Sequence, residues 1–136
     1  MAIKIEGMAP LLQVYDMPKS LWFYRDVLGF KVMQSAGEGD DVDWVSLHAN
    51  GADLMLNTLY EQPQRPEEPD PQRMDAHKDT VIFFGCPNLD EAYHHLLSNG
   101  IRLQEPEITG YGWKAINFYD PDGYQICMHW PVSEEG

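Results

Sequence analysis

The sequence predicts an α+β fold made of two βαβββ repeats in one domain spanning residues 1–136. Two observations predict it. A strand–helix–strand pattern appears twice, at residues 11–32 and 81–103, and each copy is followed by a predicted β-hairpin. We place the first repeat at about residues 8–59, a linker at 60–79 and the second repeat at about 80–131. A lone unit of this kind leaves one sheet face uncovered, so the two repeats must combine.

The first repeat begins with a strand in which Leu12 and Val14 alternate with polar residues. Asp16 is suited to accept hydrogen bonds from the free N–H groups of a helix start, and Pro18 fits in that first turn because it needs no donor. Gly29 stands where the helix should end by a left-handed turn. A hairpin with a turn at Asn50–Gly51 follows.

The second repeat has the same order. Ile82 and Phe84 alternate along a strand, Asn88 and Glu91 have the spacing of a capping box, and Gly100 ends the predicted helix. The final hairpin turns at residues 120–123, Asp-Pro-Asp-Gly.

The linker at residues 60–79 contains four prolines and a surplus of acids, so we expect neither a helix nor a central strand there. It is either a mobile acidic loop, which could cap a pocket or let the halves exchange between chains, or a plain solvated connection. Residues 2–7 are either a short extra strand or a loose end.

Composition narrows the function classes. The formal charge is −13, from 22 acids against 9 bases, which argues against nucleic acid and anionic membranes as partners. Cys86 and Cys127 each lie inside a predicted strand without framework spacing, so we expect both to be reduced and buried. The sequence has no apolar leader and no run long enough to span a membrane, and we expect a cytoplasmic protein.

Several motifs occur together in a specific order: Asp16, Phe23-Tyr24, Leu28-Gly29-Phe30 and the Asp-Pro-Asp-Gly turn at 120–123. In this combination the chain resembles the vicinal oxygen chelate superfamily of glyoxalases, ring-cleaving dioxygenases, fosfomycin-resistance enzymes and bleomycin-resistance proteins. The resemblance implies an eight-stranded cupped mixed sheet, with helices on the convex face and a ligand site in the concavity. Many members of the superfamily dimerise, so a homodimer is the expected assembly, with pairing of the two halves within one monomer as the alternative.

Metal-using members of that superfamily take ligands from the first and last strands of each repeat. The matching positions here are Ala9, Met55, Val81 and Cys127, which are poor ligands for a hard divalent ion. The resemblance is therefore closest to the metal-free bleomycin-resistance branch, and we expect no cofactor and no catalytic residue. An unorthodox metal site built from His48, His129 and Asp53 is the alternative.

Strand alternation predicts a sheet face, opposite the helices, rich in flat rings and amides. The candidate ligand-binding residues on it are Gln13, Trp44, His48, Met55, Asn57, Phe83, Trp113, Asn117, Tyr119 and Cys127. The same alternation adds Leu11, Tyr15, Ser46, Asp53, Ala115, Gln125 and His129.

Such a face suits a planar or cationic small molecule. The expected function is therefore small-molecule binding that sequesters an aromatic or cationic compound without chemistry. One alternative is a metal-dependent lyase, isomerase or dioxygenase of the glyoxalase type, with a divalent ion in a rearranged site. Another is a partner-binding module whose cup is filled by its own side chains.

Overall fold

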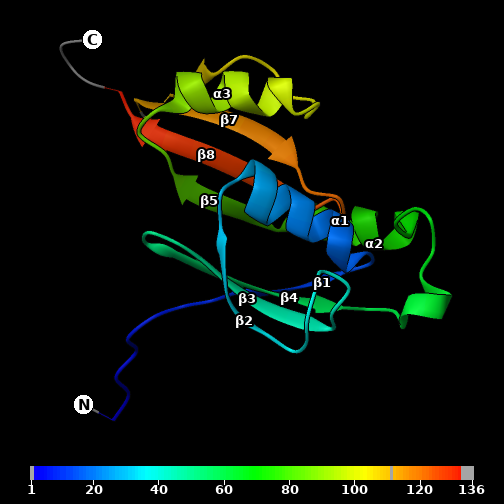
Figure 1. The fold of residues 1–136 in the computed structure, drawn as a ribbon. Helices are drawn as coiled ribbons and strands as arrows, with labels where there is room; N and C mark the ends of the chain where they lie inside the picture. Colours follow the sequence, from blue (N-terminus) through cyan, green and yellow to red (C-terminus); the bar gives the residue numbers. More distant parts are fainter. Residues whose placement is uncertain (1, 111, 133–136) are drawn as a thin grey trace. The chain divides into compact units, whose positions relative to one another are not determined.

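The computed structural model describes residues 2–110 and 112–132, and the chain divides into two compact units, Met1–Glu67 and Glu68–Gly136 (Figure 1). Each unit contains one four-stranded mixed sheet with helix on one face. The predicted α+β fold of paired βαβββ modules is confirmed, with its eight strands divided between two sheets. In the described part of the chain, no helix is both long and apolar enough to span a bilayer.

The sheet of unit 1 contains β1 (Leu11–Val14), β2 (Lys31–Ser35), β3 (Trp44–Ala49) and β4 (Ala52–Thr58). Their order is β1-β4-β3-β2, and β1 is parallel to β4 while the other pairs are antiparallel. The β3–β4 hairpin turns at Asn50, whose φ of 52° is left-handed. The alternate positions of β1, β3 and β4, which face the helix, are all at most 5% exposed: Leu12, Val14, Val45, Leu47, Leu54 and Leu56.

The helix of unit 1 starts as predicted. Asp16 accepts a hydrogen bond from the Lys19 N–H at 3.1 Å, Pro18 lies in the first turn, and Gly29 ends the helix with a φ of 90°. It is not one regular α-helix, because α1 (Met17–Leu21) widens into the π-helical η1 (Trp22–Val27). The wider turn buries Phe23 and Tyr24 side by side, with their rings in edge contact at 4.9 Å.

Tyr15 is one residue that alternation misplaces. It follows the last residue of β1 and is only 2% exposed, so it belongs to the core and not to the open sheet face. The Lys19 Nζ donates to its hydroxyl at 2.9 Å, which satisfies the polar end of the buried ring.

The sheet of unit 2 contains β5 (Val81–Gly85), β6 (Glu107–Ile108), β7 (Trp113–Tyr119) and β8 (Gln125–Pro131), in the order β5-β8-β7-β6. Helix α3 (Leu89–Ser98) contacts β7 and β8. The strand after α3 was expected to begin before Leu103 but starts only at Glu107. The reason is that the Ile101 N–H donates to the Leu96 carbonyl and is used to close the helix end.

The prediction of a capping box at the start of α3 is wrong, because the expected hydrogen bond from a helix N–H to the Asn88 side chain does not form. The Asn88 side chain accepts instead from the Cys86 Sγ at 3.3 Å and donates to the Glu91 carboxylate at 3.4 Å.

The expectation that residues 60–79 contain no helix is also wrong. They form η2 (Gln62–Gln64) in unit 1, and α2 (Pro71–Ala76) followed by η3 (His77–Asp79) in unit 2. The prolines permit this because Pro71 stands in the first turn of α2, where no N–H is needed, and Asp70 accepts from the Gln72 N–H at 2.9 Å. Residues 2–10 form no strand.

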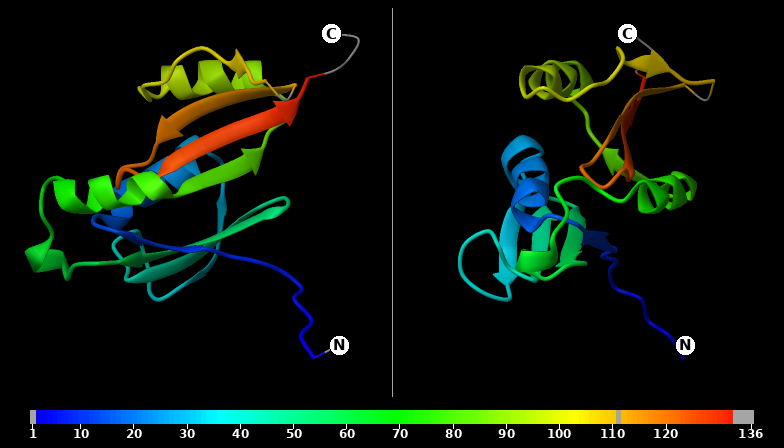
Figure 2. Two further views of the ribbon diagram at one scale, coloured as in Figure 1. Left: turned by 180° about the vertical axis from the view of Figure 1, so that it is seen from behind. Right: turned by 90° about the vertical axis from the view of Figure 1, so that its right-hand side faces the viewer.

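Helix α2 is held against the β7–β8 turn of its own unit. Arg73 donates to the carboxylate of Asp122, which is fully buried, at 3.3 Å. His77 stacks on Tyr124 with ring centroids 3.8 Å apart and hydrogen bonds through Nδ1 to the Asp122 carbonyl at 2.8 Å. Figure 2 shows α2 and this turn from two sides. The second half of the linker is therefore an ordered part of unit 2.

Candidate functional site

Each sheet has one face opposite its helix, which we call the open face. In unit 1 the strand register places Gln13, Asn57 and Trp44 in one row across β1, β4 and β3. Met55 and Ser46 form the next row, and Asp53 and His48 the third. The five candidate residues of this unit therefore share one face, as alternation predicted.

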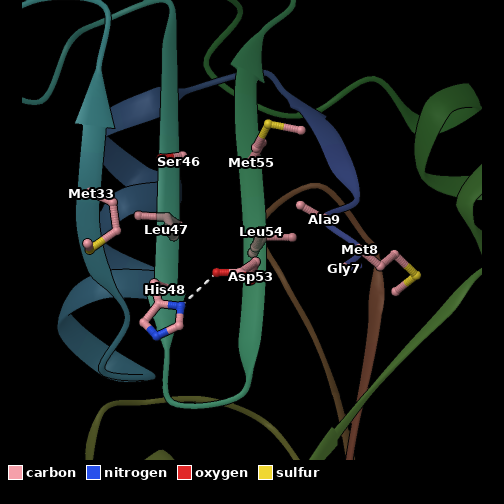
Figure 3. Close-up of a pocket in the computed structure, with 10 residues that line it drawn as sticks. All are labelled: Gly7, Met8, Ala9, Met33, Ser46, Leu47, His48, Asp53, Leu54 and Met55. Carbon is pink, nitrogen blue, oxygen red and sulfur yellow. Dashed lines mark hydrogen bonds and ion pairs between the residues drawn. The ribbon is translucent and has the colours of Figure 1, made fainter. Parts of the chain in front are cut away.

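A hollow of about 530 Å³ lies on the open face of unit 1 (Figure 3). The N-terminal segment and strands β2, β3 and β4 line it with Gly7, Met8, Ala9, Met33, Ser46, Leu47, His48, Asp53, Leu54 and Met55. Most of this lining is apolar, and three of its members are methionines, whose flexible thioethers adapt to differently shaped ligands.

The polar part of the hollow is one pair of side chains. His48 Nδ1 donates to Asp53 Oδ1 at 2.6 Å across the β3–β4 ladder, and both side chains are about half exposed. A carboxylate accepts and does not donate, so Nδ1 carries the proton of this bond, and in the neutral imidazole the other ring nitrogen, Nε2, is an acceptor.

Strand alternation did not assign Gly7, Met8 or Met33 to this face, and it places Leu47 and Leu54 on the helix side. Met33 belongs to a β-bulge between Val32 and Gln34, and a bulge shifts the alternation on which the prediction relied. Gly7 and Met8 come from the N-terminal segment, which the Pro10 carbonyl anchors by accepting from the Met55 N–H at 2.9 Å. Only the apolar character of Met8 hinted at this placement.

The open face of unit 2 carries the other candidates. Register places Phe83, Cys127 and Asn117 in one row, and Gln125 and Tyr119 in the next. Gln125 Nε2 donates to Asn117 Oδ1 at 3.0 Å, which fixes the orientation of both amides. Tyr119 also lines a smaller hollow of about 360 Å³ with α2, an element that the sequence did not predict.

A ring stack dominates this face. Trp113 lies nearly parallel to His129, with ring centroids 4.5 Å and planes 25° apart, and Phe83 meets the same imidazole edge-on at 5.0 Å. Phe83 remains 58% exposed and Tyr119 60% exposed. The face thus presents aromatic surface to solvent.

Cys127 differs from its neighbours on this face. It is only 3% exposed, and desolvation raises the pKa of its thiol above the ordinary range. A buried protonated thiol is a small apolar surface rather than a nucleophile. Cys86, expected to be buried, is half-buried instead, and burial raises the pKa of its thiol as well.

The sequence model of the glyoxalase/bleomycin resistance protein/dioxygenase superfamily matches residues 7–128. The chain belongs to this superfamily. Among solved structures, SMU.1112c is 26% identical with a TM-score of 0.72, and the alignment covers 93% of this chain and 100% of that one.

Two other solved structures with a similar fold are named for a role. TnmS3, an antibiotic binding protein from Streptomyces sp. CB03234, is 23% identical with a TM-score of 0.68, covering 97% of this chain and 99% of that one. A bleomycin resistance determinant encoded on transposon Tn5 is 23% identical with a TM-score of 0.67, covering 93% and 98%. At this identity, the likeness shows the shared fold.

Members of the superfamily that use a divalent metal need several oxygen or nitrogen ligands at one point. Within either unit, residues 2–110 and 112–132 contain no group of three His, Cys, Asp or Glu side chains placed to hold an ion. In unit 1, His48 and Asp53 bond to each other, and in unit 2, His129 is stacked on Trp113. The side chains described in each unit do not fit a hard divalent ion.

Proposed function

We propose that this protein binds a small planar molecule non-covalently on the open faces of its sheets and sequesters it without a metal ion or a chemical step. The observation that carries the proposal is the stack of Phe83, His129 and Trp113. Burying large aromatic rings contributes most of the binding energy in small-molecule sites. Phe83 and Tyr119 are both more than half exposed to water, in neighbouring rows of the same face. Exposed aromatic surface gathered on one face of an otherwise highly charged protein marks a binding site.

The polar groups between the rings support the same function. Asn117 and Gln125 are joined by a hydrogen bond and retain further donor and acceptor capacity for a ligand. A few fixed amides on an otherwise apolar surface orient a ligand without reacting with it. Antibiotic binding, the role of TnmS3, and bleomycin resistance, the role of the Tn5 determinant, agree with such a function.

The absence of a chemical step is part of the proposal. The thiol pKa of Cys127 is raised by burial, which disfavours a thiolate nucleophile. The alternative function, a metal-dependent lyase, isomerase or dioxygenase, requires His48, His129 and Asp53 to act on one ion. Within unit 1, His48 Nδ1 is already bonded to the Asp53 carboxylate.

The test combines metal analysis with ligand titration. Dialysed, untagged protein is analysed for metal by mass spectrometry, and its tryptophan fluorescence is then titrated with 9-aminoacridine, with a neutral planar probe such as acridone, and with non-planar tetraethylammonium. We expect sub-stoichiometric metal, quenching by the planar probes at micromolar concentration, and no response to tetraethylammonium. Stoichiometric metal whose removal abolishes the response, or no response to any planar probe, would contradict the proposal.

We also propose that the protein is a cytoplasmic homodimer. The support is a group of exposed apolar side chains close together in the N-terminal segment, Ile3 at 74%, Ile5 at 83% and Met8 at 82%, which a second copy would cover. Light scattering behind a sizing column should give twice the 15.6 kDa chain mass, and a monomer at all accessible concentrations would contradict it.

A further inference from the structure

We propose that the hollow of unit 1 recognises a weakly acidic O–H group on its aromatic ligand, a phenol, and that His48 accepts the proton of that group. This inference rests on the proposed small-molecule binding and names the chemistry at one of its two faces.

The first argument is the orientation of His48. Its Nδ1 is 2.6 Å from Asp53 Oδ1, a distance typical of a strong hydrogen bond to a charged acceptor. In the neutral imidazole, this contact places the proton on Nδ1 and leaves the lone pair on Nε2, on the other side of the ring from the dashed contact in Figure 3. A ligand that meets this edge of the ring must therefore bring a donor.

The second argument is the apolar lining. Met8, Met33, Met55 and Ala9 form walls without hydrogen-bonding side-chain groups. Thioethers make favourable contacts with aromatic rings, so these walls suit the body of an aromatic molecule.

The third argument is the distribution of charge. Lys31 on β2 stands directly opposite His48 in the β2–β3 ladder, while Asp53 stands opposite it on β4. One row therefore contains an ammonium, an imidazole and a carboxylate in that order across three strands.

This row stabilises the products of proton transfer. If the O–H bond of a phenol breaks and its proton goes to Nε2, the electron pair stays on oxygen as a phenolate. The new imidazolium then lies beside the Asp53 carboxylate, and the phenolate lies on a face that carries the Lys31 ammonium. Each charge that forms has a group of opposite sign in the same row of the sheet. A ligand with an ammonium donor would meet Lys31 as a like charge.

The experiment compares three probes of nearly the same shape: 4-nitrophenol, 4-nitroanisole, which lacks the O–H, and protonated 4-nitrobenzylamine. Binding is measured by tryptophan quenching. For the phenol, the visible absorption of the phenolate is also followed, at a pH where the free probe is mostly protonated. The variants are His48→Gln, which keeps the size but cannot take the proton, and His95→Gln, a matched control on the exposed face of α3.

We expect the phenol to bind about five- to tenfold more tightly than the anisole, as for one hydrogen bond to a partly exposed charged group. The phenolate band should grow on binding to the native protein and to His95→Gln, and not on binding to His48→Gln.

Equal binding of phenol and anisole, or tighter binding of the amine, would overturn the inference while leaving small-molecule binding in place. A phenolate band that survives His48→Gln would also overturn it. Failure of these probes together with 9-aminoacridine and acridone would overturn both the inference and the proposed function.

Discussion

Trp113 and His129 lie face to face on neighbouring strands of unit 2, with ring centroids 4.5 Å apart. The pair is not directly opposed in the ladder, because Trp113 is in register with Pro131 and His129 with Ala115. The contact is thus a diagonal one, which long and aromatic side chains reach on a sheet surface. The two rings form one continuous flat surface, although the residues are sixteen positions apart in the sequence.

Replacing Trp113 by alanine should weaken planar-ligand binding about five- to tenfold, since an aromatic contact contributes about 0.5–1.5 kcal/mol beyond its buried area. Trp113→Phe should retain most of the affinity. The matched control is Trp22→Ala, which removes a 41% exposed indole from η1. Titration calorimetry with 9-aminoacridine measures the effect. An equal loss in Trp22→Ala and Trp113→Ala would show that the stack is not the binding surface.

The strand pattern predicted which side chains share a face, because period-two alternation needs only local information. Leu12, Val45 and Leu54 are buried as expected, and His48 and Asp53 share the open face. Alternation fails where the backbone departs from a regular strand, at Tyr15 beyond the end of β1 and at the bulge beside Met33. A single-sequence pattern does not specify such departures.

The linker helix was missed for a different reason. The prolines of residues 60–79 argue against a helix, but only Pro71 lies within α2, and it occupies the first position. The helix depends on contacts with residues far along the chain, through Arg73 and Asp122. These partners are forty-nine positions apart, so no local signal could reveal them. The His48–Asp53 hydrogen bond was likewise a matter of side-chain geometry, which register alone does not determine.

The turn that receives α2 gives a stability prediction. Gly123 has a φ of 83°, and a Cβ placed on it would lie 3.1 Å from Met74 Cβ and Cγ. Gly123→Ala should therefore lower the free energy of unfolding by about 1–2 kcal/mol for the left-handed conformation, and further for the crowding against α2.

Gly39→Ala is the matched control for this prediction. Its φ of 77° is similar, but a Cβ there would meet nothing within 4 Å. Urea denaturation of the two variants separates conformational strain from crowding. If Gly123→Ala lowers the free energy of unfolding no more than Gly39→Ala does, the crowding against Met74 has no energetic cost, because α2 moves away from the turn.

A surface ion pair gives a pH prediction. Arg25 donates from both terminal nitrogens to Asp40, at 2.8 and 3.0 Å, and joins η1 to the loop before β3. This hydrogen bonding lowers the pKa of Asp40 below its ordinary value of 3.8. The folded state therefore binds this proton less readily than the unfolded chain does. The ion pair thus contributes to the free energy of unfolding above about pH 4, and this contribution is lost as the pH falls below that value.

Asp40→Asn should accordingly lower the free energy of unfolding by no more than about 1 kcal/mol at pH 7, because both side chains are partly in solvent. The difference in free energy of unfolding between Asp40→Asn and the native protein should shrink towards zero near pH 2. Urea denaturation at pH 7, 4 and 2 measures it, and Glu38→Gln, in the same exposed loop, serves as the control. A difference that stays constant over this range would mean that the pair does not contribute through its charge.

The two cysteines give the last prediction. Burial raises the thiol pKa of both Cys86 and Cys127, so both should be protonated at pH 8 and react with iodoacetamide more slowly than a free thiol. Cys86 should react first, because it is half-buried whereas Cys127 is 3% exposed.

A saturating planar ligand should slow the alkylation of Cys127 further, since this residue lies between Phe83 and Asn117 in one row of the open face. Peptide mass mapping after timed alkylation distinguishes the two sites, with Cys86 as the internal control. Rapid alkylation of Cys127 in the native protein would contradict its burial, and protection of Cys86 alone would place the ligand elsewhere.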